Sequence, residues 1–190
     1  MTAVRRVGAE DSATRAALLD AVEQLMREHG YPGVTSRRVA EVAGVAPTLV
    51  HYYFRTMDDL LRATLRRSAE TGLERWAAAL ASETPLASPY AIGTDADEER
   101  VLSEFAAMAR HHPEVKADLL DYGRRFRALQ VAALKQVLPD QVAGTHVPPE
   151  AVAVLLTWIS RMMLTEQDLG LEDGHAEVRE LVDRLITLLR

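Results

Sequence analysis

The sequence predicts an all-α protein, with a three-helix domain over 1–56 followed by a larger helical bundle over 57–190. Apolar residues recur at helical spacing along most of the chain. We find no segment that alternates polar and apolar residues between turn dipeptides, as a strand would. Glycines and prolines stand where helices should end and begin. Together these observations predict about eight or nine helices.

The first three helices are short and follow closely on one another. Leu18, Val22, Leu25 and Met26 form one apolar face of a helix over about 12–29, which Gly30 ends. Thr35 can cap a second helix over about 36–43, ended by Gly44. Pro47 suits the first turn of a third helix, because its missing N–H needs no partner there.

The remaining helices are longer and are separated by recognisable breaks. A helix is predicted over about 57–81, and the loop 82–95 follows it; Thr94 or Asp95 can cap the next helix. Pro113 begins a helix to about 138, with an interruption near Gly123 as one alternative. The last two helices are expected over about 149–169 and 175–190.

Composition narrows the class of protein. The 190 residues are 48% hydrophobic and 26% charged, as in a globular protein, and there is no cysteine for disulfides or thiolate metal sites. No apolar run reaches the roughly 18 residues of a membrane span, and no signal peptide is visible, so we expect a cytoplasmic protein. The net charge of −6 is uneven: residues 1–75 carry 11 basic against 10 acidic side chains. This asymmetry indicates two roles in one chain.

The stretch "RRVAEVAGVAPTLVHYYF" over 37–54 fits a helix-turn-helix, whose second helix enters the major groove of DNA. Small Ala40 permits close approach of the helices, and Gly44 can take a positive φ. Val50 and Phe54, four residues apart, can anchor the third helix to the first. More rings and hydroxyls then remain on this helix than its buried face requires.

The longer stretch "GYPGVTSRRVAEVAGVAPTLVHYYFRTMDDLL" over 30–61 is similar throughout to the N-terminal signature of the TetR family of transcriptional regulators. The long helix after it and the helical remainder also match, so the resemblance covers essentially the whole chain. It implies a ligand-responsive DNA-binding regulator, in most cases a repressor released from a palindromic operator by a small molecule. Activation is the less common alternative.

By position, the resemblance assigns DNA contacts to two helices and the residue that follows them. The implied DNA-binding residues are Ser36, Arg37, Pro47, Thr48, Leu49, His51, Tyr52 and Arg55. Two departures stand out: Ala46 replaces a common capping serine, at a cost of about 1 kcal/mol, and Met57 replaces a common lysine. Arg5 and Arg6 could reach the minor groove, although a solvated tail is the preferred interpretation.

A second group of apolar and aromatic residues resembles the family's ligand cavity. The implied ligand-binding residues are Trp76, Phe105, Met108, Tyr122, Phe126, Trp158 and Met162. For any one of them, ordinary bundle core is the better interpretation. Helical spacing places Phe126 and Trp158 among the inward-facing rings. Tyr122, Arg125 and Gln130 could orient a ligand, or could simply face solvent.

We expect neither a metal nor another cofactor, and no enzyme activity. His111, His112, His146 and His175 lack the paired Glu-x-x-His motifs of a di-iron bundle. A helical hydrolase or oxygenase is the alternative from another class, but no phosphate loop or nucleophile motif supports it.

A homodimer is expected through the last two helices. The apolar residues that exceed one subunit's needs are Val154, Leu155, Ile159, Leu181, Val182, Leu185, Ile186 and Leu189. The resemblance thus implies three partners: double-stranded DNA, a small-molecule effector and a second copy of the chain, with no membrane.

Overall fold

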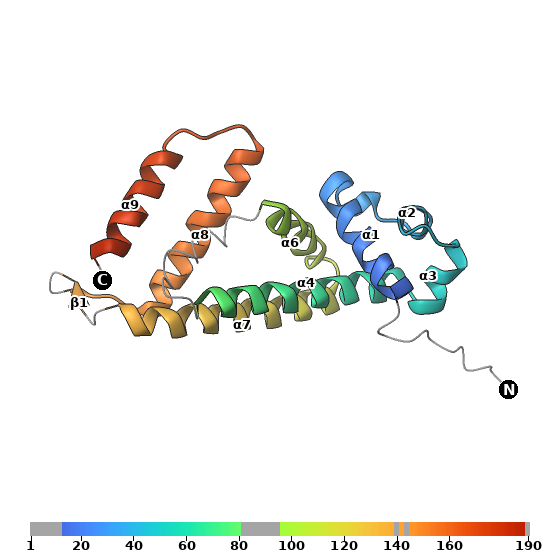
Figure 1. Cartoon of the computed structure of the whole chain (residues 1–190), viewed down its shortest axis with the longest axis horizontal. Coiled ribbons are helices and arrows are strands. Elements are labelled where there is room, and N and C mark those ends of the chain that lie inside the picture. The colour runs from blue at the N-terminus through green and yellow to red at the C-terminus, as the bar shows by residue number, and fades with distance from the viewer. Residues whose placement is uncertain (1–12, 81–95, 139–140, 143–144, 189–190) are drawn as a thin grey trace. The chain divides into compact units, whose positions relative to one another are not determined.

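The computed structural model describes residues 13–80, 96–138, 141–142 and 145–188 (Figure 1). Within these ranges the chain forms eight α-helices, a 3-10 turn and a two-stranded hairpin. The helices are α1 (Ala13–His29), α2 (Ser36–Val42), α3 (Pro47–Tyr53), α4 (Met57–Leu80), α6 (Ala96–Met108), α7 (Pro113–Val137), α8 (Pro149–Asp168) and α9 (His175–Leu188). The all-α prediction is confirmed. Arg5, Arg6, the loop 82–95 and its candidate caps lie outside the described residues.

The hairpin is an element that the sequence did not predict. Strands β1 (Gln141–Val142) and β2 (Thr145–His146) pair antiparallel, Gln141 opposite His146 and Val142 opposite Thr145. Two residues a strand are too few to show the alternation on which strand prediction depends. The alternative of a break near Gly123 is wrong: α7 runs unbroken through it. A single glycine costs a helix only about 1 kcal/mol, less than the rest of a long helix supplies.

The chain divides into two compact units, which we describe separately. Unit 1 comprises residues 1–70 and 100–121, and unit 2 comprises residues 71–99 and 122–190. Helices α4, α6 and α7 therefore each contribute residues to both units. The functional division at residues 56 and 57 does not follow these packing units, and we retain it as a proposal.

The core of unit 1 is built around α1. The predicted face of α1, with Leu18, Val22, Leu25 and Met26, is buried, and so are Leu61 and Leu65 of α4. Val101, Leu102, Phe105 and Met108 of α6 are buried as well. These apolar faces fix the short helices α2 and α3, which have too few residues to be stable alone.

Unit 2 contains a core cluster of α7 and α8. Leu134 and Ala153 are buried at its centre, and Val131, Leu138, Val152 and Leu156 pack around them. The inner face of α8 continues with the buried residues Ser160, Met163 and Leu164. Gly170 follows the C-terminal end of α8 and has φ 79°, a conformation that glycine adopts without strain.

One polar contact joins the end of α8 to the beginning of α9. The imidazole of His175 is 4% exposed, and its Nε2 lies 2.9 Å from a carboxylate oxygen of Glu166. His175 is the first residue of α9 and Glu166 belongs to the last turn of α8. The histidine that sequence inspection examined as a metal ligand therefore has a structural partner.

Candidate nucleic-acid interface and effector site

The turn between α2 and α3 has the geometry of a tight helix end. Thr35 caps α2, its hydroxyl accepting a hydrogen bond of 3.3 Å from the backbone N–H of Arg38. At the other end Gly44 has φ 66°. Its N–H donates to the carbonyl of Glu41 at 3.1 Å, and that of Val45 donates to Ala40 at 2.9 Å. This bond pair is a Schellman motif, which satisfies the last carbonyls of α2 and redirects the chain into α3.

Helix α3 is held by a few buried anchors. Val50 is 1% exposed and Phe54 is 4% exposed, so the predicted anchoring pair is confirmed. The guanidinium of Arg15 lies 5.1 Å from the ring centre of Phe54, a cation–π contact with α1. Ala46 provides no side-chain cap, as its residue type implied. Packing and the N1 proline, rather than capping, therefore fix the beginning of α3.

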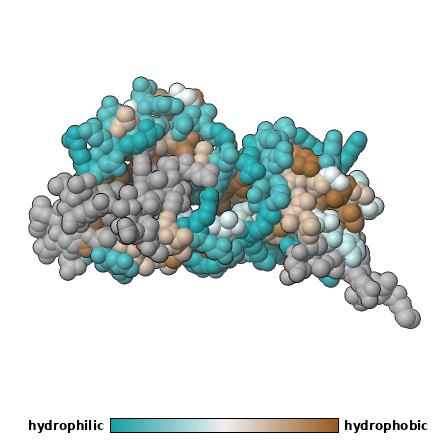
Figure 2. All heavy atoms as spheres, viewed as in Figure 1, coloured by the Kyte–Doolittle hydropathy of each residue, from teal (hydrophilic) through white to brown (hydrophobic). Residues whose placement is uncertain are grey.

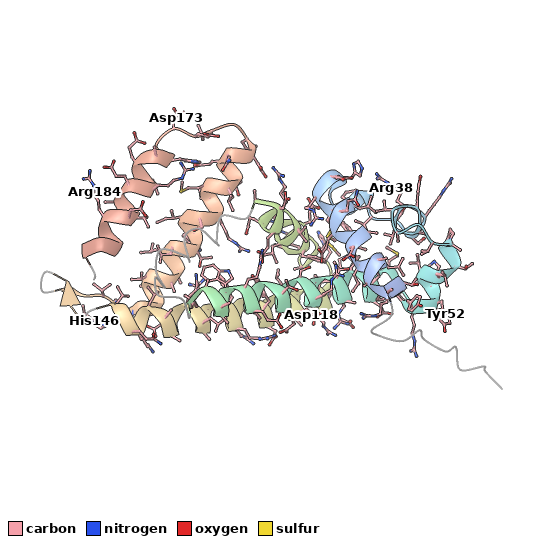
Figure 3. The ribbon with its side chains drawn as sticks, viewed as in Figure 1. Arg38, Tyr52, Asp118, His146, Asp173 and Arg184 are labelled. Carbon is pink, nitrogen blue, oxygen red and sulfur yellow. The ribbon has the colours of Figure 1, made fainter. Side chains whose placement is uncertain are left out.

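The opposite face of α3 is open. Pro47, Thr48, His51 and Tyr52 are exposed and Leu49 is half-buried. Tyr52 is 41% exposed and projects away from the ribbon (Figure 3). Its ring meets that of Tyr53 edge-on, with centroids 5.1 Å apart. Figure 2 shows hydrophobic spheres among hydrophilic ones over α2 and α3, an unusual mixture for a helix that faces only water.

The other residues expected to contact DNA flank this face. Ser36 is half-buried at the beginning of α2, whereas Arg37 and Arg55 are exposed. A helix N-terminus with adjacent arginines offers N–H donors and positive charge to a phosphate. Met57, where the family commonly has lysine, is half-buried. The structure thus leaves most of the proposed contact residues accessible.

The N-terminus of α4 carries a capping box that sequence inspection missed. The N–H of Asp59 donates to the hydroxyl of Thr56 at 3.0 Å, and the N–H of Thr56 donates to the carboxylate of Asp59 at 3.2 Å. The signal was available, because a threonine three residues before an acidic residue is the known pattern. It gives α4 a fixed beginning directly after the exposed Arg55.

Further polar contacts between distant residues secure unit 1. Arg62 and Arg66 of α4 each donate to Asp118 of α7, at 2.8 Å, and Arg62 also pairs with Glu114. Burial alone would raise the pKa of the Asp118 carboxyl, but the hydrogen bonds from the two arginines hold that pKa below its ordinary value. Glu104 of α6 accepts the backbone N–H of Tyr31 at 2.6 Å. These partners are 52 to 73 residues apart, so no local pattern indicates them.

The predicted effector residues belong to both units. Phe105 and Met108 are buried in unit 1. Trp76, Tyr122 and Phe126 form an aromatic cluster in unit 2, with ring centroids 4.7 Å apart for Trp76 and Phe126 and 5.9 Å apart for Tyr122 and Phe126. Burial raises the pKa of the Tyr122 hydroxyl to about 12, and the neighbouring carboxylate of Glu98 adds to this effect.

The expectation that Trp158 faces inward is wrong. Trp158 is 70% exposed and Met162 is 58% exposed, on the same face of α8 as Val154 and Leu155. We call Val154, Leu155, Trp158 and Met162 the α8 stripe. Ala153, Ser160, Met163 and Leu164 occupy the buried face instead, and Ala153 packs against Leu134 of α7.

The expected dimerisation residues differ in how exposed they are. Leu181 of α9 is 57% exposed, but Val182 is 5% exposed and is covered by its own chain, so its assignment to an interface is wrong. Ile159 is half-buried. The side chains of Leu185 and Ile186, and the whole of Leu189, lie outside the described residues. Gln130 is 7% exposed and accepts a hydrogen bond of 3.2 Å from the hydroxyl of Thr157, so it is not a solvated surface residue.

A capped α2, a glycine turn and an open α3 at the N-terminus of a helical chain define a helix-turn-helix DNA-binding protein. The family model of bacterial regulatory proteins, tetR family, matches residues 18–64. The chain is 32% identical over 139 residues to the HTH-type transcriptional regulator BetI of Brucella anthropi, covering 68% of this chain and 72% of that one. The chain belongs to the TetR family of transcriptional regulators.

Two further similarities extend over nearly the whole chain. BetI of Rhizobium meliloti is 27% identical over 187 residues, 94% of this chain and 91% of its own. A transcriptional regulator from Saccharomonospora viridis, solved in complex with choline, superposes with a TM-score of 0.73 at 20% identity and covers 92% of each chain. The second similarity shows the fold, which extends beyond the helix-turn-helix to the C-terminal helices.

The protein is therefore a DNA-binding transcriptional regulator and not an enzyme. Across the described ranges, no helix is both long and apolar enough to cross a membrane. In the same ranges, His, Asp and Glu side chains nowhere gather in a group of three that could hold a metal ion.

Proposed function

We propose that the protein is a homodimeric repressor that leaves a palindromic operator when a small molecule binds to its C-terminal domain. The observation that carries this proposal is the pairing of two open surfaces on one chain. The face of α3 mixes hydroxyl, imidazole and ring groups that match base edges and phosphates. The α8 stripe is apolar and matches a second copy of itself.

The dimer follows from the chemistry of the α8 stripe. Leu155, Trp158 and Met162 are each more than half exposed in the isolated chain, and an apolar patch of this kind rarely stays in contact with water. Leu181 adds a large apolar residue on α9. A two-fold axis would bring two copies of α8 and α9 into a four-helix interface, which covers the patch without an additional partner.

The palindrome follows from the dimer. Two recognition helices related by a two-fold axis must reach successive major grooves, about 34–36 Å apart, and so read inverted half-sites. Pro47, Thr48 and Leu49 are proposed to face bases, and Ser36, Arg37, His51, Tyr52 and Arg55 to face phosphates. The division into a DNA-binding domain over 1–56 and an effector and dimerisation domain over 57–190 is part of this proposal, as is action in the cytoplasm.

A small molecule can act as effector without any chemical step. A ligand that binds better to a conformer with the wrong half-site spacing shifts the population away from DNA. The aromatic cluster of Trp76, Tyr122 and Phe126 is the proposed centre of its site. Since the regulator from Saccharomonospora viridis was solved with choline, choline is the first compound to test.

The test is selection of binding sites from a random-sequence duplex library, with sedimentation of the free protein. The proposal predicts an inverted repeat whose half-site centres lie one helical turn apart, and a dimer at micromolar concentration. A selected site without two-fold symmetry, or a monomer that binds it at full affinity, would contradict the proposal.

A further inference from the structure

We propose that a hollow beside α3 binds a phosphate of the DNA backbone, with the guanidinium of Arg15 and the hydroxyl of Tyr53 as its ligands. Neither residue is among the DNA contacts proposed above. The inference rests on the proposed function for the placement of α3 in the major groove. Every residue involved belongs to unit 1.

The hollow lies between the beginnings of α1 and α4 and the end of α3. Its volume is about 210 Å³, several times the space that one water molecule needs, and it is open to solvent. Two of its cations, Arg62 and Arg66, share the carboxylate of Asp118, so the proposal depends on the third, Arg15. The residues that line the hollow are Arg15, Tyr53, Phe54, Asp59, Arg62, Ala63 and Arg66.

An aromatic ring positions the guanidinium of Arg15. Its central carbon lies 5.1 Å from the ring centre of Phe54, and Phe54 is a buried anchor of α3. A ring face orients a guanidinium but has no net charge, so the ring leaves the positive charge of Arg15 available to an anion. Arg15 is also half-buried, and a side chain that is already ordered loses less entropy when it binds a phosphate.

Tyr53 connects the hollow with the face of α3 that is proposed to meet DNA. Tyr53 is half-buried and lines the hollow. Its ring also meets that of the exposed Tyr52 edge-on, with centroids 5.1 Å apart. Tyrosine hydroxyls commonly donate hydrogen bonds to phosphate oxygens in protein–DNA complexes. The hollow therefore combines a cation and a hydroxyl donor next to the proposed DNA contacts.

The width of the major groove brings phosphates to this position. The groove is about 12 Å wide, and a helix with its side chains is about 10–12 Å across. A helix in the groove therefore fills it, and the elements on its two sides lie against the two phosphate strands. Ser36 and Arg37 of α2 are the contacts proposed for one strand. The lining of the hollow comes from α1, α3 and α4, and we assign it to the other strand.

The first experiment counts phosphate contacts by the salt dependence of binding. Each phosphate that a protein cation neutralises contributes about 0.9 to the slope of log affinity against log salt concentration. Arg15→Gln should lower that slope by about 0.9 and weaken binding to operator and random duplex alike, by roughly five- to tenfold at about 0.1 M salt. Fluorescence anisotropy of the full-length protein at sodium chloride concentrations from about 0.05 to 0.4 M measures both.

Three further variants separate charge from hydrogen bonding. Arg15→Lys keeps the charge and should keep the slope of the wild type. Tyr53→Phe should weaken binding to both duplexes by roughly fivefold without changing the slope, because the lost hydroxyl is uncharged. Arg27→Gln is the matched control on the same helix: Arg27 pairs with Glu23 at 4.0 Å and does not line the hollow, so slope and affinity should stay unchanged.

A second experiment identifies the phosphate. Duplexes that carry one uncharged methylphosphonate, at each backbone position around a half-site in turn, are titrated with wild type and Arg15→Gln. At the contacted position the wild type should lose as much affinity as Arg15→Gln loses on unmodified DNA, and Arg15→Gln should lose little more. Tyr53→Phe should couple to the same position, which keeps the test available if Arg15→Gln does not fold.

A free phosphate ion is the other source of the same chemistry. Calorimetry of the protein with sodium phosphate, without DNA, tests this source. Binding of the free ion that disappears in Arg15→Gln, with no methylphosphonate position coupled to Arg15 or Tyr53, would overturn the assignment to DNA.

The slope also separates a phosphate contact from a contribution to folding. Arg15→Gln removes the contact with Phe54 and can lower the melting temperature, but a variant that is only less stable keeps the slope of the wild type. An unchanged slope in Arg15→Gln, or an equal decrease in Arg27→Gln, would overturn the inference. If the protein selects no palindromic operator, the proposed function fails, and the slope on random duplex still tests the phosphate contact.

Discussion

The exposed faces of α3 and α8 both present aromatic side chains to solvent, but their surroundings differ. On α3, Tyr52 stands among a threonine, a histidine and a proline, and arginines flank the helix. On α8, Trp158 stands among valine, leucine and methionine. A mixed polar and aromatic face can hydrogen-bond to bases and phosphates, whereas a continuous apolar face can only exclude water. Exposure alone therefore does not define a partner; the neighbours of the exposed ring do.

The largest effect is expected for a charge placed in the α8 stripe. Leu155→Glu would put a carboxylate into the proposed dimer interface, where an unpaired buried charge is costly. We expect monomers in sedimentation, and a loss of operator affinity of roughly 10²–10⁴-fold, because two half-sites no longer act together.

The matched control for this change is Leu120→Glu on α7. Leu120 is 48% exposed but lies outside the α8 stripe, so the dimer should persist. If Leu155→Glu forms a normal dimer, α8 is not part of the interface, and the α8 stripe does not bind a second copy of the chain.

The next effect compares the two tryptophans. Trp76 is 4% exposed and Trp158 is 70% exposed, so Trp76→Ala should lower the free energy of unfolding by about 3–5 kcal/mol at any protein concentration. Trp158→Ala should act through the dimer, with a loss that shrinks on dilution because the wild-type dimer then dissociates as well. Urea denaturation at two protein concentrations measures both. If Trp158→Ala instead loses several kcal/mol at every protein concentration, Trp158 packs within the core of a single chain and not in a dimer interface.

These two residues show what the sequence can and cannot predict. The helix-turn-helix could be predicted in detail because its determinants are local: Thr35, Gly44 and Pro47 act within a few residues of their own positions. Trp76 and Trp158 have the same side chain on similar amphipathic helices. Which face of α8 meets α7 depends on packing against a distant helix, and helical spacing does not decide this.

The same reason accounts for the site residues that were missed. Asp118 joins Arg62 and Arg66 across more than fifty residues, and Glu104 reaches the backbone of Tyr31 across 73. The hairpin was missed because it is too short to show a period. The capping box of Thr56 and Asp59, by contrast, is local and could have been recognised.

A smaller effect is expected from the ion pairs of Asp118, which stabilise unit 1. Asp118→Asn leaves two arginines without their carboxylate and should cost about 1–3 kcal/mol at pH 7. Because the folded-state pKa of Asp118 is lowered, this contribution is present at neutral pH and disappears as the pH falls through that pKa, below the usual value of about 4.

Urea denaturation of wild type and Asp118→Asn between pH 7 and pH 3.5 measures this difference. The gap between the two should be constant down to about pH 5 and then narrow. Glu114→Gln is the control: its side chain is 73% exposed and pairs with the same Arg62, so its loss should stay below about 1 kcal/mol. A gap that widens toward acid would contradict the assigned direction of the pKa shift.

The smallest effects separate two roles within the face of α3. Thr48 is exposed in the first turn of α3, where the helix would meet base edges. If it reads a base, Thr48→Ala should reduce the discrimination between the selected operator and a single-base variant by about 1–3 kcal/mol. If Tyr52 instead meets a phosphate, Tyr52→Phe should weaken binding to the operator and to random duplex alike, by about 1 kcal/mol. Anisotropy titrations at fixed salt, with both duplexes and both variants, measure the four affinities. If Thr48→Ala loses the same affinity on every sequence, its hydroxyl contacts the DNA backbone and not a base. If Tyr52→Phe loses affinity only for the operator, Tyr52 contacts a base, because only a base contact can depend on sequence in this way.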